Sequence, residues 1–142
     1  MAIAQGATNT FKVGLLDGSF DFGTTTFKIA LYTGAASLGP DTTAYTTDGE
    51  VVASGYTAGG ETLTVTQVPT IGNQTGNATA YLSFSNVAWT SALTARGALI
   101  YKSGSGNPTV CVLDFGADKT STTTFTVQFP AATNTAAIIR IS

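Results

Sequence analysis

The sequence contains no histidine, and it has only one cysteine, one methionine and one tryptophan in 142 residues. Histidine is the commonest general base and metal ligand near neutral pH, so its absence removes the usual route to hydrolytic chemistry. A single cysteine excludes a disulfide within the chain. Because Cys111 lies in the apolar run VCVLDF and has no histidine to activate it, we expect it to be buried and inert.

Charge is also scarce, at 10% of residues against about 25% in ordinary soluble domains. The six lysines and arginines are scattered along the chain and form no basic patch, which argues against nucleic acid as a partner. No run approaches the ~18 apolar residues of a membrane span, and the first residues lack a signal-peptide pattern. We therefore expect a protein that acts without secretion and without a membrane.

The missing charge is replaced by small polar residues, with 27 threonines and 16 glycines. Threonine is β-branched and favours strands, so the composition predicts a β-rich protein. Apolar residues alternate with other residues at 27–32, 63–65, 82–84 and 125–129, which is typical of half-buried strands.

Several further strands follow from local patterns. The apolar runs at 97–102 and 109–115 are joined by SGSGNP, a sequence of turn formers, and predict a β-hairpin. Residues 11–16, FKVGLL, and the final stretch AAIIRIS are also expected to be strands. The one helical candidate is a single turn in TSALTARG, residues 90–97.

These patterns predict an all-β, single-domain fold of about eight antiparallel strands, arranged as a sandwich or a jelly roll. The domain covers residues 11–142. Residues 1–10 are polar and show no pattern for burial in their own core, so we expect them to form an N-terminal arm.

The stretch EVVASGYTAGG, residues 50–60, suggests either a ligand-binding loop or a backbone hinge. It lacks the spacing of a phosphate-binding loop, and Gly59 and Gly60 are followed by an acidic residue, Glu61, and then by a strand. Paired glycines supply the positive φ that a tight turn requires. We therefore predict a hinge.

Other chemical patterns also have plain structural interpretations. The tripeptide DFG at 114–116 has no accompanying kinase motifs and is expected to end a strand. The acidic pairs Asp17 with Asp21 and Asp48 with Glu50 lack EF-hand spacing and are expected to be solvated turn residues. Trp89 and the five tyrosines form either a sugar-binding platform or, as we favour, part of the core. We assign no catalytic residue, metal or cofactor, and we expect no enzyme activity.

The order of FKIALYTG, EVVASGYTAGG, NVAWT, GALIYK and VLDFG resembles small virion proteins of tailed bacteriophages, from about residue 11 to the end. The resemblance implies head decoration, in which small oligomers made in the host cytoplasm bind the outer surface of the capsid and cement it. The partner would be the major capsid protein. A tail or fibre component that binds a receptor or carbohydrate is the alternative, and an unrelated β-sandwich binding domain or enzyme is a third hypothesis.

A single small domain can cement a shell only by touching more than one subunit, so we expect a homo-oligomer, a trimer rather than a dimer. The N-terminal arm and the loop from Gly34 to Gly60 are the segments expected to reach neighbouring subunits. Within them the candidate partner-binding residues are Ala2, Thr8, Asn9, Thr10, Tyr45 and Tyr56.

Overall fold

The structure is a computed structural model that describes residues 2–72 and 78–142. Strands make up 44% of the described residues and helix 7%, which confirms the all-β prediction. The described residues contain ten strands, more than the eight expected. The elements are β1 (Gly6–Ala7), α1 (Asn9–Asp17), β2 (Phe27–Tyr32), β3 (Glu61–Leu63), β4 (Val65–Gly72), β5 (Thr79–Phe84), β6 (Val87–Trp89), β7 (Thr94–Lys102), β8 (Thr109–Thr120), β9 (Phe125–Val127) and β10 (Ile139–Ile141).

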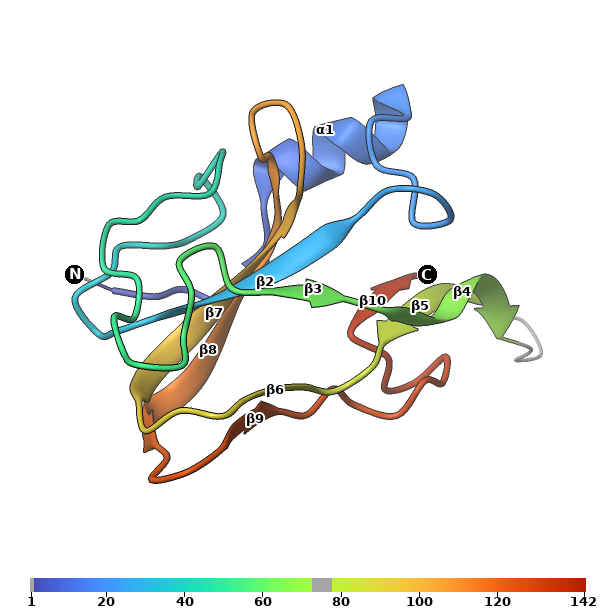
Figure 1. Cartoon of the computed structure of the whole chain (residues 1–142). Coiled ribbons are helices and arrows are strands. Elements are labelled where there is room, and N and C mark those ends of the chain that lie inside the picture. The colour runs from blue at the N-terminus through green and yellow to red at the C-terminus, as the bar shows by residue number, and fades with distance from the viewer. Residues whose placement is uncertain (1, 73–77) are drawn as a thin grey trace.

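The largest sheet has five antiparallel strands in the order β1-β8-β7-β2-β3. Its centre is the predicted hairpin of β7 and β8, which crosses the molecule in Figure 1. The DFG tripeptide does not end a strand, as predicted, but lies inside β8 at a register shift opposite Gly97. There the backbone N–H of Gly116 and the Arg96 guanidinium hold the pKa of Asp114 below its usual value.

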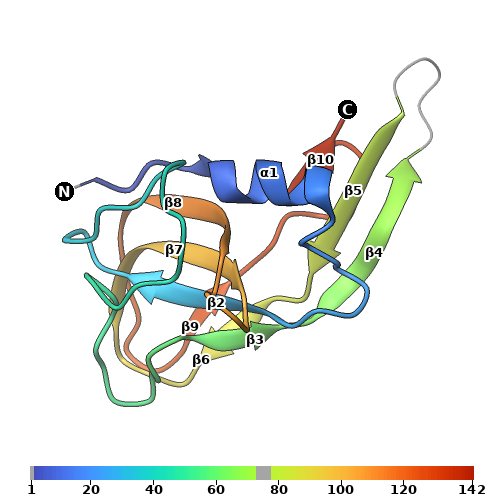
Figure 2. The same ribbon diagram turned by 90° about the horizontal axis from the view of Figure 1, so that it is seen from above.

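Two smaller antiparallel sheets complete the fold, β10-β5-β4 and β6-β9. The chain passes from the large sheet to the three-stranded sheet at Thr64, between β3 and β4. Seen from above, the β4–β5 hairpin extends to one side of the body (Figure 2). The main hydrophobic core includes residues from all three sheets, such as Ile29, Leu82 and Trp89, whose side chains are at most 5% exposed.

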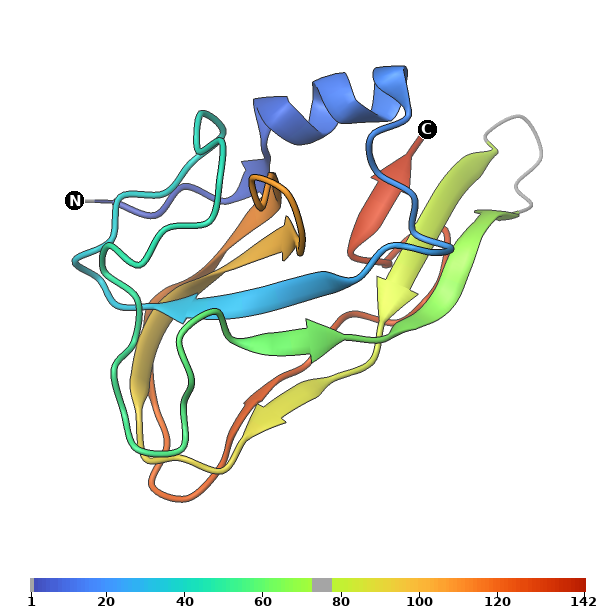
Figure 3. The same ribbon diagram turned by 45° about the horizontal axis from the view of Figure 1, so that its top comes forward.

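The second face of the large sheet is also buried. The long loop of residues 33–60 covers it, at the left of Figure 3, and a second apolar cluster lies on this face. Ala30 and Tyr32 are fully buried there. The prediction that β2 is half-buried was therefore wrong, because the loop supplies a cover that alternation within the strand does not reveal.

Residues 11–16 belong to α1 and not to a strand, which corrects the sequence prediction. The buried Thr8 caps the helix by accepting a hydrogen bond from the Phe11 N–H, and Gly18 ends it with φ of 78°. Phe11 and Gly14 form the buried face; a Cβ on Gly14 would lie 2.2 Å from the Phe20 ring. Residues 90–97, the expected helical turn, contain no helix: residues 94–97 are the start of β7, and residues 90–93 lead into it.

The N-terminal segment is attached to its own chain and is not a free arm. Gly6 and Ala7 pair with Val112 and Cys111 of β8, and backbone bonds join residues 2 and 4 to Leu38. The expected boundary at residue 10 falls inside α1. Met1 lies outside the described residues.

Candidate functional site

The six residues expected to bind a partner do not form one surface. Thr8 is fully buried, and its hydroxyl contacts the backbone carbonyls of Thr109 and Val110. Tyr56 is also buried. These two residues serve their own fold, which corrects the expectation that they contact a partner.

The other four expected residues retain exposed surface. Ala2 and Asn9 are exposed, and Thr10 and Tyr45 are half-buried. Asn9 links the N-terminal segment to the long loop, because its side-chain amide donates to Asp41 at 2.8 Å. A role for these four in binding a partner stays a prediction.

The glycine pair has the backbone geometry of a hinge. Gly59 and Gly60 have φ values of 95° and 74°, and β3 begins at the next residue. A Cβ on Gly60 would lie 1.8 Å from the carbonyl oxygen of Ile29. This close approach to β2 requires glycine, so the predicted hinge is confirmed in its geometry.

A buried carboxylate, Glu50, holds the loop that ends at this hinge. Its Oε1 accepts hydrogen bonds from the Tyr56 hydroxyl and from the Gly59 N–H, both at 2.7 Å, and its Oε2 accepts one from the Tyr45 hydroxyl at 2.6 Å. Glu50 is 7% exposed, so these three donors replace the water that it would otherwise bind. The prediction that Glu50 is a solvated turn residue was therefore wrong, because tyrosines and a backbone N–H of the same chain surround its carboxylate.

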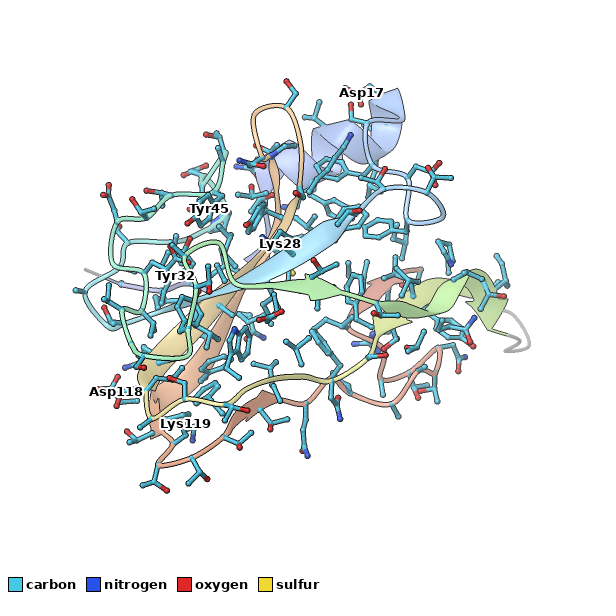
Figure 4. The ribbon with its side chains drawn as sticks, in the orientation of Figure 1. Asp17, Lys28, Tyr32, Tyr45, Asp118 and Lys119 are labelled. Atoms are coloured by element: carbon cyan, nitrogen blue, oxygen red, sulfur yellow. The ribbon has the colours of Figure 1, made fainter. Side chains whose placement is uncertain are left out.

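Further tyrosines complete the cluster around Glu50. The Tyr101 hydroxyl donates to the Gly59 carbonyl at 2.7 Å, and its ring stacks on Tyr45 with centroids 4.8 Å apart. Tyr32 donates to the Thr46 carbonyl at 2.6 Å, and Figure 4 shows Tyr32 and Tyr45 in the region of the long loop. Burial, together with the Glu50 charge, raises the pKa of Tyr32 and Tyr45 far above the usual value.

This tyrosine cluster is suited to holding a loop. Both carboxylate oxygens of Glu50 are bound by donors of the same chain, and the raised pKa values of Tyr45 and Tyr56 keep these hydroxyls protonated to higher pH than usual. These hydrogen bonds therefore explain how residues 33–60 are held in place. They do so without a catalytic role for Glu50 or the tyrosines. In the part of the chain that the structure describes, no group of three acidic or cysteine side chains is arranged to hold a metal ion.

The remaining sequence candidates also have structural roles. Asp21 forms a turn by accepting from Gly23 and Thr24, and Asp17 accepts from Ser19. Trp89 is 2% exposed and packs near Tyr56 and Phe125, which confirms its place in the core and removes it as a sugar platform. Among the described residues, no helix has the length and apolar character needed to cross a membrane.

Several large apolar side chains on α1 and on the three-stranded sheet are exposed to solvent. Val13, Leu15 and Leu16 on α1 are 62%, 38% and 91% exposed, and Ile71 and Ile141 on the three-stranded sheet are 64% and 53% exposed. We call Leu15, Ile71 and Ile141 the apolar surface, since Val13 and Leu16 lie on the opposite side of α1, away from the buried Phe11. A contiguous patch of exposed apolar side chains marks a site where a protein binds other molecules.

The register of the three-stranded sheet explains how the apolar surface forms. Ile71 and Ile141 both pair with Ala80 from opposite sides, so the three side chains form one row on one face. Leu15 and Ile141 both line a cleft of about 430 Å³ between α1 and this sheet. The only charged residue in these three strands, Arg140, points to the other face, where it donates to the Thr135 carbonyl.

Comparisons with protein-family models, curated proteins and solved structures found no match to this chain.

Proposed function

We propose that the protein is a structural component of a bacteriophage virion that binds the outside of the capsid and stabilises it. The observation that carries the proposal is the apolar surface, in which Leu15 and Ile141 are 38% and 53% exposed and line a cleft of about 430 Å³. An isolated domain gains nothing from such exposure, whereas an assembled one buries it. The sequence resemblance to small virion proteins is the reason for proposing a phage particle as the assembly that buries this surface.

The low charge of the chain supports the same proposal. Residues 62–95 and 121–139 contain no charged side chain, so the three-stranded sheet and the β6–β9 pair carry only Arg140. A surface that is covered by partners needs little charge of its own for solubility. The proposed partners are the major capsid protein and further copies of the same chain, and the proposed location is the outer surface of the head.

The attached N-terminal segment changes how capsid contact is expected to occur. Because residues 2–8 are bound to β8 and to the long loop, a contact made by an extended arm would first have to break those bonds. The apolar surface is available without such a change. We therefore place the principal capsid contacts on Leu15 and the three-stranded sheet, and not on an arm.

The test is to locate the protein in purified particles by electron microscopy and to heat particles that carry it or lack it. We expect density on the head exterior and rupture at a lower temperature without the protein. Protein found only on tails would transfer the assignment to a tail or fibre component. Equal rupture temperatures would contradict a cementing role.

A further inference from the structure

The outer face of α1 combines apolar and charged side chains in a regular arrangement. Val13 and Leu16 lie three residues apart and form its middle, opposite the buried Phe11. Lys12 lies one turn before Leu16, and Asp17 lies one turn after Val13, so opposite charges lie on opposite flanks and at opposite ends. We define the outer face of α1 by Lys12, Val13, Leu16 and Asp17.

This face is not covered by its own chain. α1 runs along the top margin of the molecule, and Figure 4 places Asp17 at its far end. All four residues are exposed. Asp17 also accepts hydrogen bonds from Ser19, which holds its carboxylate at the end of the helix.

We propose that a second copy of the chain binds to the outer face of α1 through a twofold axis. A twofold contact presents the same residues from both sides, so it is favourable only when a surface complements itself. Here an axis between the two helices can bring Lys12 of each copy against Asp17 of the other, while Val13 and Leu16 pack at the centre. The charge pattern thus favours a second copy over an unrelated partner.

The inference rests on the proposed function for its expectation of a homo-oligomer, and it identifies the surface and the symmetry. It replaces the trimer expected from the sequence with a twofold pair. Pairing between edge strands is less suitable, because β4 is interrupted by Pro69 and by two register shifts. In this arrangement the row of Ile71, Ala80 and Ile141 stays free to bind the capsid.

Charge reversal tests the proposal most directly. Lys12→Glu and Asp17→Lys should each weaken the dimer about tenfold or more, because like charges then meet at two symmetric positions. The double variant should restore it, since opposite charges face each other again. Asp118→Lys and Lys119→Glu, at the tip of β8 away from α1 in Figure 4, are exposed matched controls and should leave the dimer unchanged.

An apolar variant provides an independent test. Leu16→Lys should weaken the dimer by about a hundredfold, because it places two charges at the centre of the contact. Val52→Lys is the matched control, since Val52 is 97% exposed but lies on the long loop. Sedimentation equilibrium measures the dimer, and circular dichroism melting verifies that each variant is folded.

The outcomes separate this inference from the proposed function. A wild-type monomer, a trimer, or a dimer indifferent to Leu16→Lys and to charge reversal would overturn the twofold contact. Binding of each variant to capsids that lack the protein is measured in parallel. Failure of wild-type protein to bind capsids overturns the proposed function whatever the oligomeric state, whereas capsid binding by a wild-type monomer overturns only the inference.

Discussion

At the scale of single residues, two glycines with nearly the same φ differ in how much space surrounds them. Gly60 and Gly106 have φ of 74° and 75°. A Cβ on Gly60 would meet the Ile29 carbonyl oxygen at 1.8 Å, whereas a Cβ on Gly106 would meet nothing within 4 Å. A substitution at Gly106 therefore measures backbone strain alone, whereas a substitution at Gly60 measures backbone strain together with steric overlap.

We expect Gly106→Ala to lower the free energy of unfolding by about 1 kcal/mol, the cost of positive φ in a residue with a Cβ. Gly60→Ala should cost at least ~2 kcal/mol more, because β2 and the hinge must also move apart. Urea unfolding of both variants measures the difference. Equal losses would show that the approach of Gly60 to β2 is unimportant.

The buried tyrosines make stability depend on alkaline pH. Burial raises the pKa of Tyr32 and Tyr56 above the usual value of 10, so the folded chain keeps protons that the unfolded chain releases. The free energy of unfolding should therefore fall as pH rises above 10. Tyr32→Phe should make the decrease of the free energy of unfolding with pH less steep, by up to about 1.4 kcal/mol per pH unit. This is the contribution of one titrating group.

Urea unfolding between pH 9 and about 11.5 measures these slopes. Tyr32→Phe also removes the bond to the Thr46 carbonyl, which lowers stability at every pH without changing the slope. Parallel curves for wild type and variant would contradict a raised pKa at Tyr32.

At the scale of elements, the loop of residues 33–60 behaves as a cover that is fixed at Glu50. Glu50→Ala would leave the Tyr45 hydroxyl, the Tyr56 hydroxyl and the Gly59 N–H without their acceptor. We expect a loss of about 2–4 kcal/mol and faster amide hydrogen exchange across the loop. Glu61→Ala is the control, because Glu61 is exposed and should change stability by less than about 0.5 kcal/mol.

Hydrogen exchange followed by mass spectrometry distinguishes a fixed loop from an independent one. A Glu50→Ala protein with wild-type protection over residues 33–60 would show that apolar contacts such as Leu38 with the sheet hold the loop without the carboxylate. Faster amide hydrogen exchange in this loop alone would support the conclusion that the tyrosine cluster around Glu50 holds the loop in place.

At the scale of the whole molecule, the N-terminal segment closes the edge of the large sheet. β1 pairs with Cys111 and Val112, and Thr8 caps α1 while contacting β8. Deleting residues 2–8 should lower stability by more than ~2 kcal/mol through loss of the cap and of the strand pairing. It should also expose Cys111, whose pKa burial raises to about 12.

Thiol labelling provides the readout for this deletion. In wild-type protein Cys111 should react only after unfolding, and in the deletion variant it should react in native buffer. A variant that keeps wild-type stability and an unreactive thiol would restore the original expectation that the segment is a free arm.

The sequence by itself determined what depends on neighbouring residues. Alternating apolar residues and turn formers predicted the β7–β8 hairpin, the glycine pair predicted the hinge before β3, and the apolar run around Cys111 predicted its burial. Each of these signals lies within about a dozen residues. They also sufficed for the all-β fold class.

The tertiary structure decided what depends on residues far apart in the chain. FKVGLL became a helix because Thr8 caps it and Gly14 accommodates Phe20, and Thr8 is itself held by Thr109, 101 residues away. Alternation predicts one buried face, but β2 is buried on both because residues 33–60 return over it. The outer face of α1 likewise exists only because the opposite side of this short helix packs onto the sheets. Local sequence does not encode such covering, since it arises when distant segments exclude water together.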